Sequence, residues 1–117
     1  MKLGTIAGAC VHTEQMINIE DVYKDERFEQ RFDKQTGYRT RSMLAIPIQD
    51  KRTQNIMGCI QCMNKENAEG ESEGVVFSKD DEDLGMAFAN ILAVALEQQS
   101  SANKAESAVD LVVRNLV

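Results

Sequence analysis

Residues 43–63 read MLAIPIQDKRTQNIMGCIQCM, and this stretch decides the fold. It contains two apolar runs of strand length, 43–48 and 56–63, on either side of a polar turn at 49–55. Pro47 closes the first run, and proline is tolerated mainly at the edges and ends of strands. Two such runs joined by a short polar turn predict an antiparallel β-hairpin.

A helix is predicted after Ser78, where Ser78 and Asp81 have the spacing of a capping box. Acidic residues at 80–83 lie near its positive end. Apolar residues then follow in steps of four and three, as on one side of an amphipathic helix: Leu84, Phe88, Ile91, Leu92 and Ala95. The same register continues through Gln98, Ala102, Ala105, Val109, Val112 and Leu116. The spacing predicts one long helix that outreaches a core of this size, so its far end is expected to need a partner.

The region before the hairpin is predicted to consist of short helices and loops. Residues 4–12 are small and apolar, which suits a short, closely packed helix. Residues 20–41 are polar, and their aromatic side chains have irregular spacings that fit no single strand: Tyr23, Phe28, Phe32 and Tyr38. We expect these aromatics to point inward or over a cavity. The acidic segment 66–74 is expected to be a solvated loop.

Size and charge exclude several classes of protein. A chain of 117 residues can bury one modest core but not two. Its net charge of −6 and pI near 4.8 make nucleic acid and anionic membrane surfaces unfavourable partners. The longest strictly apolar run, Ile91 to Leu96, is too short to span a bilayer. Three cysteines cannot all pair within one chain, so we expect reduced thiols and a cytoplasmic protein.

Three stretches of the chain, in this order, resemble a GAF domain. The first is 4–8 (GTIAG), followed by 18–23 (NIEDVY) and 25–28 (DERF). The second is 32–41 (FDKQTGYRTR), which leads into 43–48. The third combines Asn64, Lys65, Phe77, Asp81 and Glu82, similar to the Asn-Lys…Phe-x-x-x-Asp-Glu signature of the family. The resemblance is to the cyclic-nucleotide-binding GAF domains in the regulatory halves of phosphodiesterases and some adenylate cyclases.

The resemblance implies an α+β fold: an antiparallel sheet flanked by helices and followed by a long C-terminal helix. It extends from about Gly4 to Gln99 and matches only the later part of a GAF domain. The helix and strands with which the family begins, which help to hold the purine, have no counterpart here. We therefore expect a partial GAF domain at 1–99 and a C-terminal helical extension or inter-domain connecting helix at 100–117.

The resemblance also implies an allosteric ligand, cAMP or cGMP, and no cofactor or metal. By the family's pattern, Ala7 lies near the cyclic phosphate at a helix start, where free backbone N–H groups attract anions. Phe32, Asp33 and Thr36 are expected over the base and ribose, and Thr40 and Gln61 near the base edge. Lys65 and Asp81 are expected to form a buried ion pair beneath the pocket, and loss of one partner of such a pair is costly.

The resemblance implies a regulatory domain, not an enzyme, within a parent protein such as a 3′,5′-cyclic nucleotide phosphodiesterase. A single histidine, His12, cannot build the metal site of such a hydrolase, and we assign it no role. A homodimer through the C-terminal helix is expected. In this interpretation, ligand closes the loops around Phe32 to Thr40, and Lys65 and Asp81 transmit the change to the helix after Ser78.

Two other functions remain open at this stage. One is a GAF dimerisation module without ligand. The other is a GAF-fold thiol reductase that would use Cys10, Cys59 or Cys62. A zinc site built from Cys59, Cys62, Cys10 and His12 is disfavoured, because residues three apart on a strand point to opposite faces.

Overall fold

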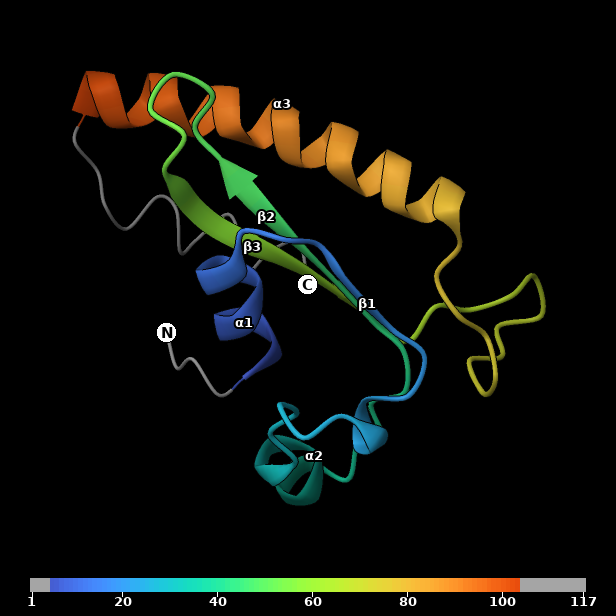
Figure 1. Ribbon diagram of the computed structural model, residues 1–117. Helices are drawn as coiled ribbons and strands as arrows, with labels where there is room; N and C mark the ends of the chain where they lie inside the picture. Colours follow the sequence, from blue (N-terminus) through green and yellow to red (C-terminus); the bar gives the residue numbers. More distant parts are fainter. Residues whose placement is uncertain (1–4, 104–117) are drawn as a thin grey trace.

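The computed structural model describes residues 5–103, and for 99–103 it describes the helical backbone alone. Its core is a three-stranded antiparallel sheet in the order β1-β2-β3. Helix α3 packs along one face of the sheet, α1 packs on the other, and α2 lies beyond one end (Figure 1). The elements are α1 (Ile6–Thr13), β1 (Ile17–Ile19), η1 (Val22–Lys24), α2 (Arg31–Thr36), β2 (Met43–Gln49), β3 (Ile56–Met63) and α3 (Lys79–Asn103). This arrangement confirms the predicted α+β fold.

The predicted hairpin is confirmed, and a third strand that the sequence did not indicate lies beside it. Strands β2 and β3 pair from Met43↔Met63 to Gln49↔Ile56. The short strand β1 pairs with residues 43–45 of β2 alone. Pro47 therefore lies where β2 has a partner on one side only, which is where a strand tolerates a residue without an N–H group. A strand of three residues is too short to show the alternation that reveals longer strands.

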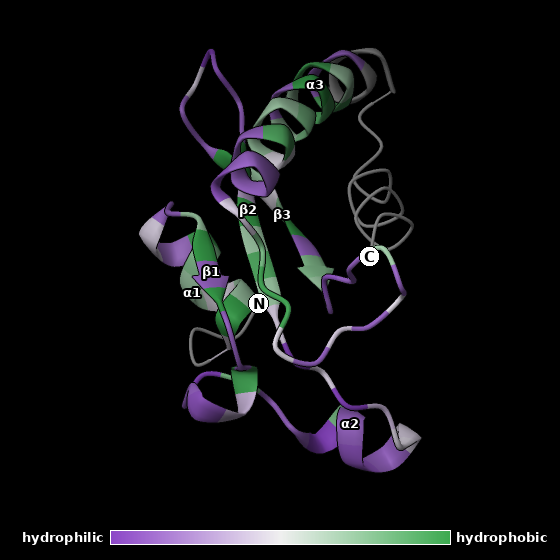
Figure 2. Cartoon of the chain, turned by 90° about the vertical axis from the view of Figure 1, so that its right-hand side faces the viewer, coloured by the Kyte–Doolittle hydropathy of each residue, from purple (hydrophilic) through white to green (hydrophobic). Residues whose placement is uncertain are grey.

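Side chains alternate along β2 and divide the interior into two cores. Leu44, Ile46 and Ile48 face α3 and pack with Ala89, Ala93 and Leu96. Met43 and Ala45 face the opposite way and pack with Ile6, Cys10, Val22 and Cys59. Figure 2 shows the hydrophobic strands β2 and β3 between the two helices. Strand β2 is buried on both faces, so it appears in the sequence as a nearly continuous apolar run.

The predicted start of α3 is confirmed by its hydrogen bonds. The backbone N–H of Ser78 donates to Asp81 Oδ2 (2.8 Å), and the backbone N–H of Asp81 donates to Ser78 Oγ (3.2 Å). These two bonds form the reciprocal capping box. The predicted continuation of the helix over 104–117 lies outside the described residues.

Most of the apolar stripe seen in the sequence faces away from the sheet, and among its large residues only Leu92 packs against the core. Leu84, Phe88 and Ile91 are 72%, 42% and 66% exposed, whereas Ala89, Ala93 and Leu96 are buried. Small residues let the helix backbone approach β2 closely. Large side chains on this face would keep the helix farther from the sheet. The face with the small residues therefore packs against the sheet.

Gly85 makes this close approach possible, and a branched side chain there should disrupt it. A Cβ atom at Gly85 would lie 2.2 Å from Ile46 Cδ1 and 3.8 Å from Leu44 Cδ2. We expect Gly85→Val to lower the free energy of unfolding by about 2 to 3 kcal/mol, because the added methyls overpack the core. Urea denaturation measures the change. Ala87→Val, at an exposed position of the same helix, is the matched control and should cost about 1 kcal/mol or less.

Within residues 5–103, no helix is both long and apolar enough to cross a membrane.

Candidate functional site

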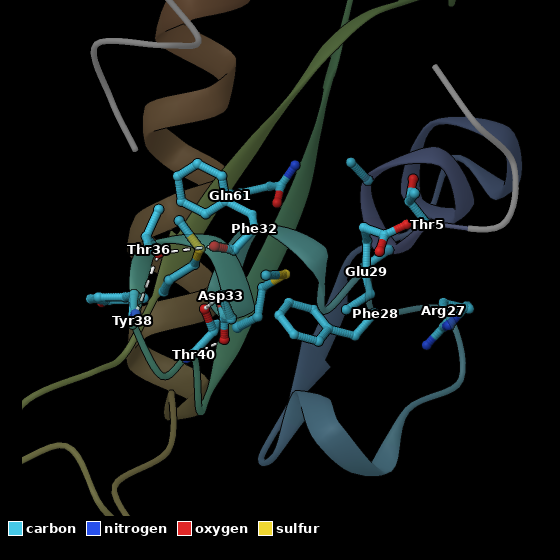
Figure 3. A pocket seen from close by; sticks show the side chains of 14 residues that line it. Thr5, Arg27, Phe28, Glu29, Phe32, Asp33, Thr36, Tyr38, Thr40 and Gln61 are labelled. Atoms are coloured by element: carbon cyan, nitrogen blue, oxygen red, sulfur yellow. Dashed lines mark hydrogen bonds between the residues drawn. The ribbon is translucent and has the colours of Figure 1, made fainter.

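A cavity of about 690 Å³ lies between α1, α2 and the face of the sheet that α1 covers. The chain segments that meet here are far apart in the sequence: the start of α1, the loop before α2, α2 itself, and the ends of β2 and β3 (Figure 3). The lining residues are Thr5, Ile6, Ala7, Arg27, Phe28, Glu29, Phe32, Asp33, Thr36, Tyr38, Thr40, Met43, Gln61 and Met63.

All six residues that the resemblance assigns to ligand lie on this cavity: Ala7, Phe32, Asp33, Thr36, Thr40 and Gln61. They come from three helical or loop segments and from β3. The other lining residues were not assigned to the site from sequence, although the irregularly spaced aromatics had indicated Phe28 and Tyr38 as candidates for a cavity.

The first turn of α1 faces the cavity through Thr5, Ile6 and Ala7. Thr5 caps this helix, since its hydroxyl oxygen accepts from the backbone N–H of Gly8 at 3.0 Å. The first N–H groups of a helix have no acceptor within the helix and lie at the positive end of its dipole. This end of the cavity is therefore suited to an anionic group such as a phosphate.

Asp33 lies on the cavity, but internal hydrogen bonds occupy its carboxylate. Its Oδ2 accepts from the Tyr23 hydroxyl and from the Thr40 backbone N–H, both at 2.8 Å. Its Oδ1 accepts from the Thr40 hydroxyl at 2.9 Å. Burial by itself raises the pKa of Asp33, but these hydrogen bonds outweigh it and hold the pKa below its usual value. Asp33 thus fixes α2 against η1 and the following loop, and it also lines the cavity.

Helix α2 carries the exposed Phe32 in its first turn and ends at Gly37. The Thr36 hydroxyl donates to the Phe32 carbonyl (2.9 Å) and accepts from the Tyr38 N–H (3.3 Å). Gly37 between them has φ 77°, a left-handed conformation that suits glycine at a helix end. Phe32 is 67% exposed although it borders the cavity. A large apolar side chain in this position would gain buried area by closing over a ligand.

Asn64, directly after β3, connects the cavity wall to the rest of the fold. It has φ 57°, a conformation that asparagine tolerates better than most residues. Its side-chain amide donates to the Tyr38 hydroxyl (2.8 Å) and to the Arg39 carbonyl (3.0 Å). Its side-chain oxygen accepts from the Arg41 N–H. One side chain therefore ties together the loop from α2 to β2.

The predicted ion pair between Lys65 and Asp81 is confirmed, but it is not buried. The two side chains are 30% and 25% exposed. The Lys65 ammonium and the Ser78 N–H both donate to Asp81, and they lower its pKa. Nearby, Asn18 donates to the Phe77 carbonyl and to Glu82. The motif residues thus attach the start of α3 to the end of β3 and to β1.

Because the Lys65–Asp81 pair is partly solvated, its removal should cost little and should depend on pH. Asp81 has a depressed pKa, so its contribution is complete above its unfolded pKa of about 3.9 and is lost as the pH falls through the lower folded value. We expect Lys65→Met to lower the free energy of unfolding at pH 7 by about 1 kcal/mol, and by less at pH 3. Lys79→Met, whose ammonium is bonded to Asp83 at 3.2 Å but lies on the surface, is the control and should change little.

The three cysteines lie on both faces of the sheet, and two of their thiols are buried. Cys59 packs in the core under α1, and Cys62 packs against the core under α3, so the two thiols lie on opposite faces of the sheet. Over the described part of the chain, His, Cys, Asp and Glu form no group that could hold a metal. Cys10 and Cys59 are 0% and 2% exposed. The Cys59 thiol and burial raise the pKa of Cys10, and burial raises that of Cys62, whereas the hydrogen bond with Cys10 lowers the pKa of the buried Cys59 thiol.

Comparison with known proteins identifies relatives of this fold. The family model described as "GAF domain" matches residues 1–96. The chain is 38% identical over 91 residues to the cone cGMP-specific 3′,5′-cyclic phosphodiesterase subunit alpha′ of Gallus gallus, covering 78% of this chain and 10% of that protein. It is 35% identical over 91 residues to dual 3′,5′-cyclic-AMP and -GMP phosphodiesterase 11A of Takifugu rubripes, covering 78% and 9%.

A solved structure supports the fold independently. The GAF domain from a phosphoenolpyruvate-protein phosphotransferase of Coxiella burnetii superposes with a TM-score of 0.72 at 19% identity, covering 90% of this chain and 57% of that one. At this identity the likeness bears on the fold alone. The chain thus spans little more than half of a comparable domain and about a tenth of the curated relatives it matches.

Proposed function

The chain belongs to the GAF domain family, and we propose that it is a regulatory module of a cyclic-nucleotide signalling protein that binds cAMP or cGMP. The observation that carries the proposal is the cavity itself. It gathers the six residues of the nucleotide-binding pattern and the first turn of α1 around one space. Cavities of several hundred Å³ are of the size that holds small-molecule ligands.

In the proposed complex, the cyclic phosphate lies at the start of α1, where Ala7 leaves room beside the backbone N–H groups. Gln61 can donate to and accept from a base edge. The Thr40 hydroxyl donates to Asp33 and keeps a lone pair for a ligand donor. Phe32 closes over the ligand from α2. The mix of donors and acceptors fits a purine without choosing between adenine and guanine.

We propose that closure of α2 is transmitted to α3 through the turn after β3. Tyr38 and Arg39 move with α2 and are bonded to Asn64. The next residue, Lys65, is bonded to Asp81 in the first turn of α3. A shift of the α2 loop therefore reaches α3 through two adjacent residues. This short path supports a regulatory role for the chain rather than a catalytic one, with any phosphodiesterase activity located in another part of a longer protein.

A thermal-shift measurement tests the proposal. It uses the longest natural form of the protein that contains this chain, with the 117-residue chain in parallel. Either cAMP or cGMP should raise the midpoint of unfolding in a concentration-dependent way, since a ligand at 100 times its Kd stabilises by about 2.7 kcal/mol. The noncyclic 5′-AMP and 5′-GMP should shift it less. No shift by either cyclic nucleotide at millimolar concentration would contradict the proposal.

A second candidate, a dimerisation module, is favoured by the outer face of α3. Leu84, Phe88, Ile91 and Val94 are all exposed there, on the side of the helix away from the sheet. An unpartnered apolar face of this kind marks an interaction site. Sedimentation experiments would separate the two functions. A dimer of unchanged affinity with and without cyclic nucleotide, together with no thermal shift, would favour this second candidate.

A further inference from the structure

One aromatic residue of the cavity, Phe28, has no ligand contact assigned by the family pattern. Phe28 lines the cavity from the loop between η1 and α2. In Figure 3 its side chain extends into the middle of the labelled residues, between Asp33 on one side and Arg27 and Glu29 on the other. It is half-buried, because it packs against the core around Ile6 and Val22 while it also borders the cavity.

A second ring supports Phe28 from behind. The rings of Tyr23 and Phe28 lie 5.3 Å apart at 52°, within the range of favourable aromatic pairs. The Arg39 guanidinium lies 3.8 Å from the centroid of the Tyr23 ring. The Tyr23 hydroxyl donates to the Asp33 carboxylate, which also accepts from the Thr40 backbone N–H. Tyr23 is therefore fixed both at its ring and at its hydroxyl, and it limits how far Phe28 can retreat from the cavity.

The backbone of Phe28 is fixed as well. Its N–H donates to the Asp25 carbonyl at 3.1 Å. The preceding residue, Arg27, forms a two-pronged contact with the Asp25 carboxylate, through Nε at 2.9 Å and Nη2 at 2.7 Å. Such bidentate pairs hold geometry well. The ring is thus placed by its own backbone and by Tyr23 before any ligand arrives.

We propose that Phe28 is the stacking surface for the planar base of the ligand and that Tyr23 is its positioning residue. The inference rests on the proposed function, because it concerns the ligand of the same cavity. A preset ring lowers the entropy cost of binding, since it need not be ordered when the ligand enters. Stacking tolerates different bases because each presents an aromatic face. Phe28 thus contributes affinity, whereas the choice between purines depends on edge contacts.

Proton NMR of the bound nucleotide tests the stacking directly in the unmodified protein. Protons above the face of an aromatic ring are shielded, so H8 of bound cAMP or cGMP should shift upfield. Phe28→Leu, which keeps apolar bulk, should abolish most of that shift and weaken affinity about tenfold. It should leave the affinity for ribose 3′,5′-cyclic phosphate, which has no base, unchanged. Tyr23→Phe keeps the ring and removes the hydroxyl, so it should reduce the upfield shift only in part.

The outcomes separate this inference from the proposed function. Phe88→Leu, on the outer face of α3, is the matched control and should bind as the unmodified chain does. A nucleotide that binds with an unshifted H8, or binds Phe28→Leu as tightly as the unmodified protein, would show Phe28 to be a core residue only and would overturn the inference. If the unmodified protein binds neither nucleotide, the proposed function fails and the inference falls with it.

Discussion

Asp33→Asn is expected to lower the free energy of unfolding by about 2 to 4 kcal/mol, because hydrogen bonds to a buried charge are lost together. The carboxylate accepts three hydrogen bonds while only 4% exposed. An amide of the same shape can accept through one atom only, and its NH₂ group must face donors. The segment from Tyr23 to Thr40 should loosen, and ligand affinity should fall with it.

The loss of stability in Asp33→Asn should depend on pH. Because the pKa of Asp33 is depressed, its stabilisation is complete above the unfolded value of about 3.9 and is lost as the pH falls through the folded value. Urea denaturation of Asp33→Asn and of the unmodified chain should therefore differ at pH 7 and converge towards pH 2. Asp83→Asn, which alters a carboxylate that is 64% exposed, is the control and should change stability little. A difference that persists at pH 2 would assign the effect to packing instead of charge.

Asn64→Ala is expected to have the next largest effect, about 2 to 3 kcal/mol. It removes the amide that bonds Tyr38 and Arg39 and the oxygen that accepts from Arg41. It also places alanine at φ 57°, where a Cβ atom is unfavourable.

Asn64→Gly separates these two contributions. Glycine relieves the backbone conformation but restores none of the side-chain bonds, so it should be more stable than Asn64→Ala by about 1 kcal/mol. Both variants should uncouple nucleotide binding from α3. Amide hydrogen exchange across residues 79–90 measures the coupling, since ligand should protect these amides in the unmodified protein alone. Equal protection in Asn64→Gly would contradict transmission through this turn.

The hairpin and the start of α3 could be predicted because local chemistry determines them. The apolar runs at 43–48 and 56–63 and the capping box at Ser78 depend on neighbours within a few residues. The strand β1 depends on pairing with β2, which is distant in sequence. The face that α3 presents to the sheet depends on how closely Gly85 lets it approach Ile46. A hydrophobic pattern favours large residues and cannot detect that constraint.

The candidate site also could be predicted only in part, because some of its features depend on packing between distant segments. The resemblance identified six residues that the fold does gather around one cavity. It could not show that the Asp33 carboxylate is occupied by Tyr23 and Thr40, because that depends on the packing of η1 against α2. It also placed Lys65 and Asp81 in the interior, whereas the pair is partly solvated in this chain. Burial of an ion pair is a property of the surrounding surface, which no motif specifies.

The most direct test of the central claim, that the cavity holds a cyclic nucleotide with its phosphate at α1, is a calorimetric titration of the Ala7→Asp variant with cAMP and with cGMP. Ala7 lies in the first turn of α1 and lines the cavity. A carboxylate there suits the helix dipole but lies half-buried beside the core, so the midpoint of unfolding of each variant is measured alongside, and the carboxylate would repel a phosphate. We predict binding by the unmodified protein and by Ala7→Ser, and loss of binding by Ala7→Asp. Equal affinity in all three would contradict the account.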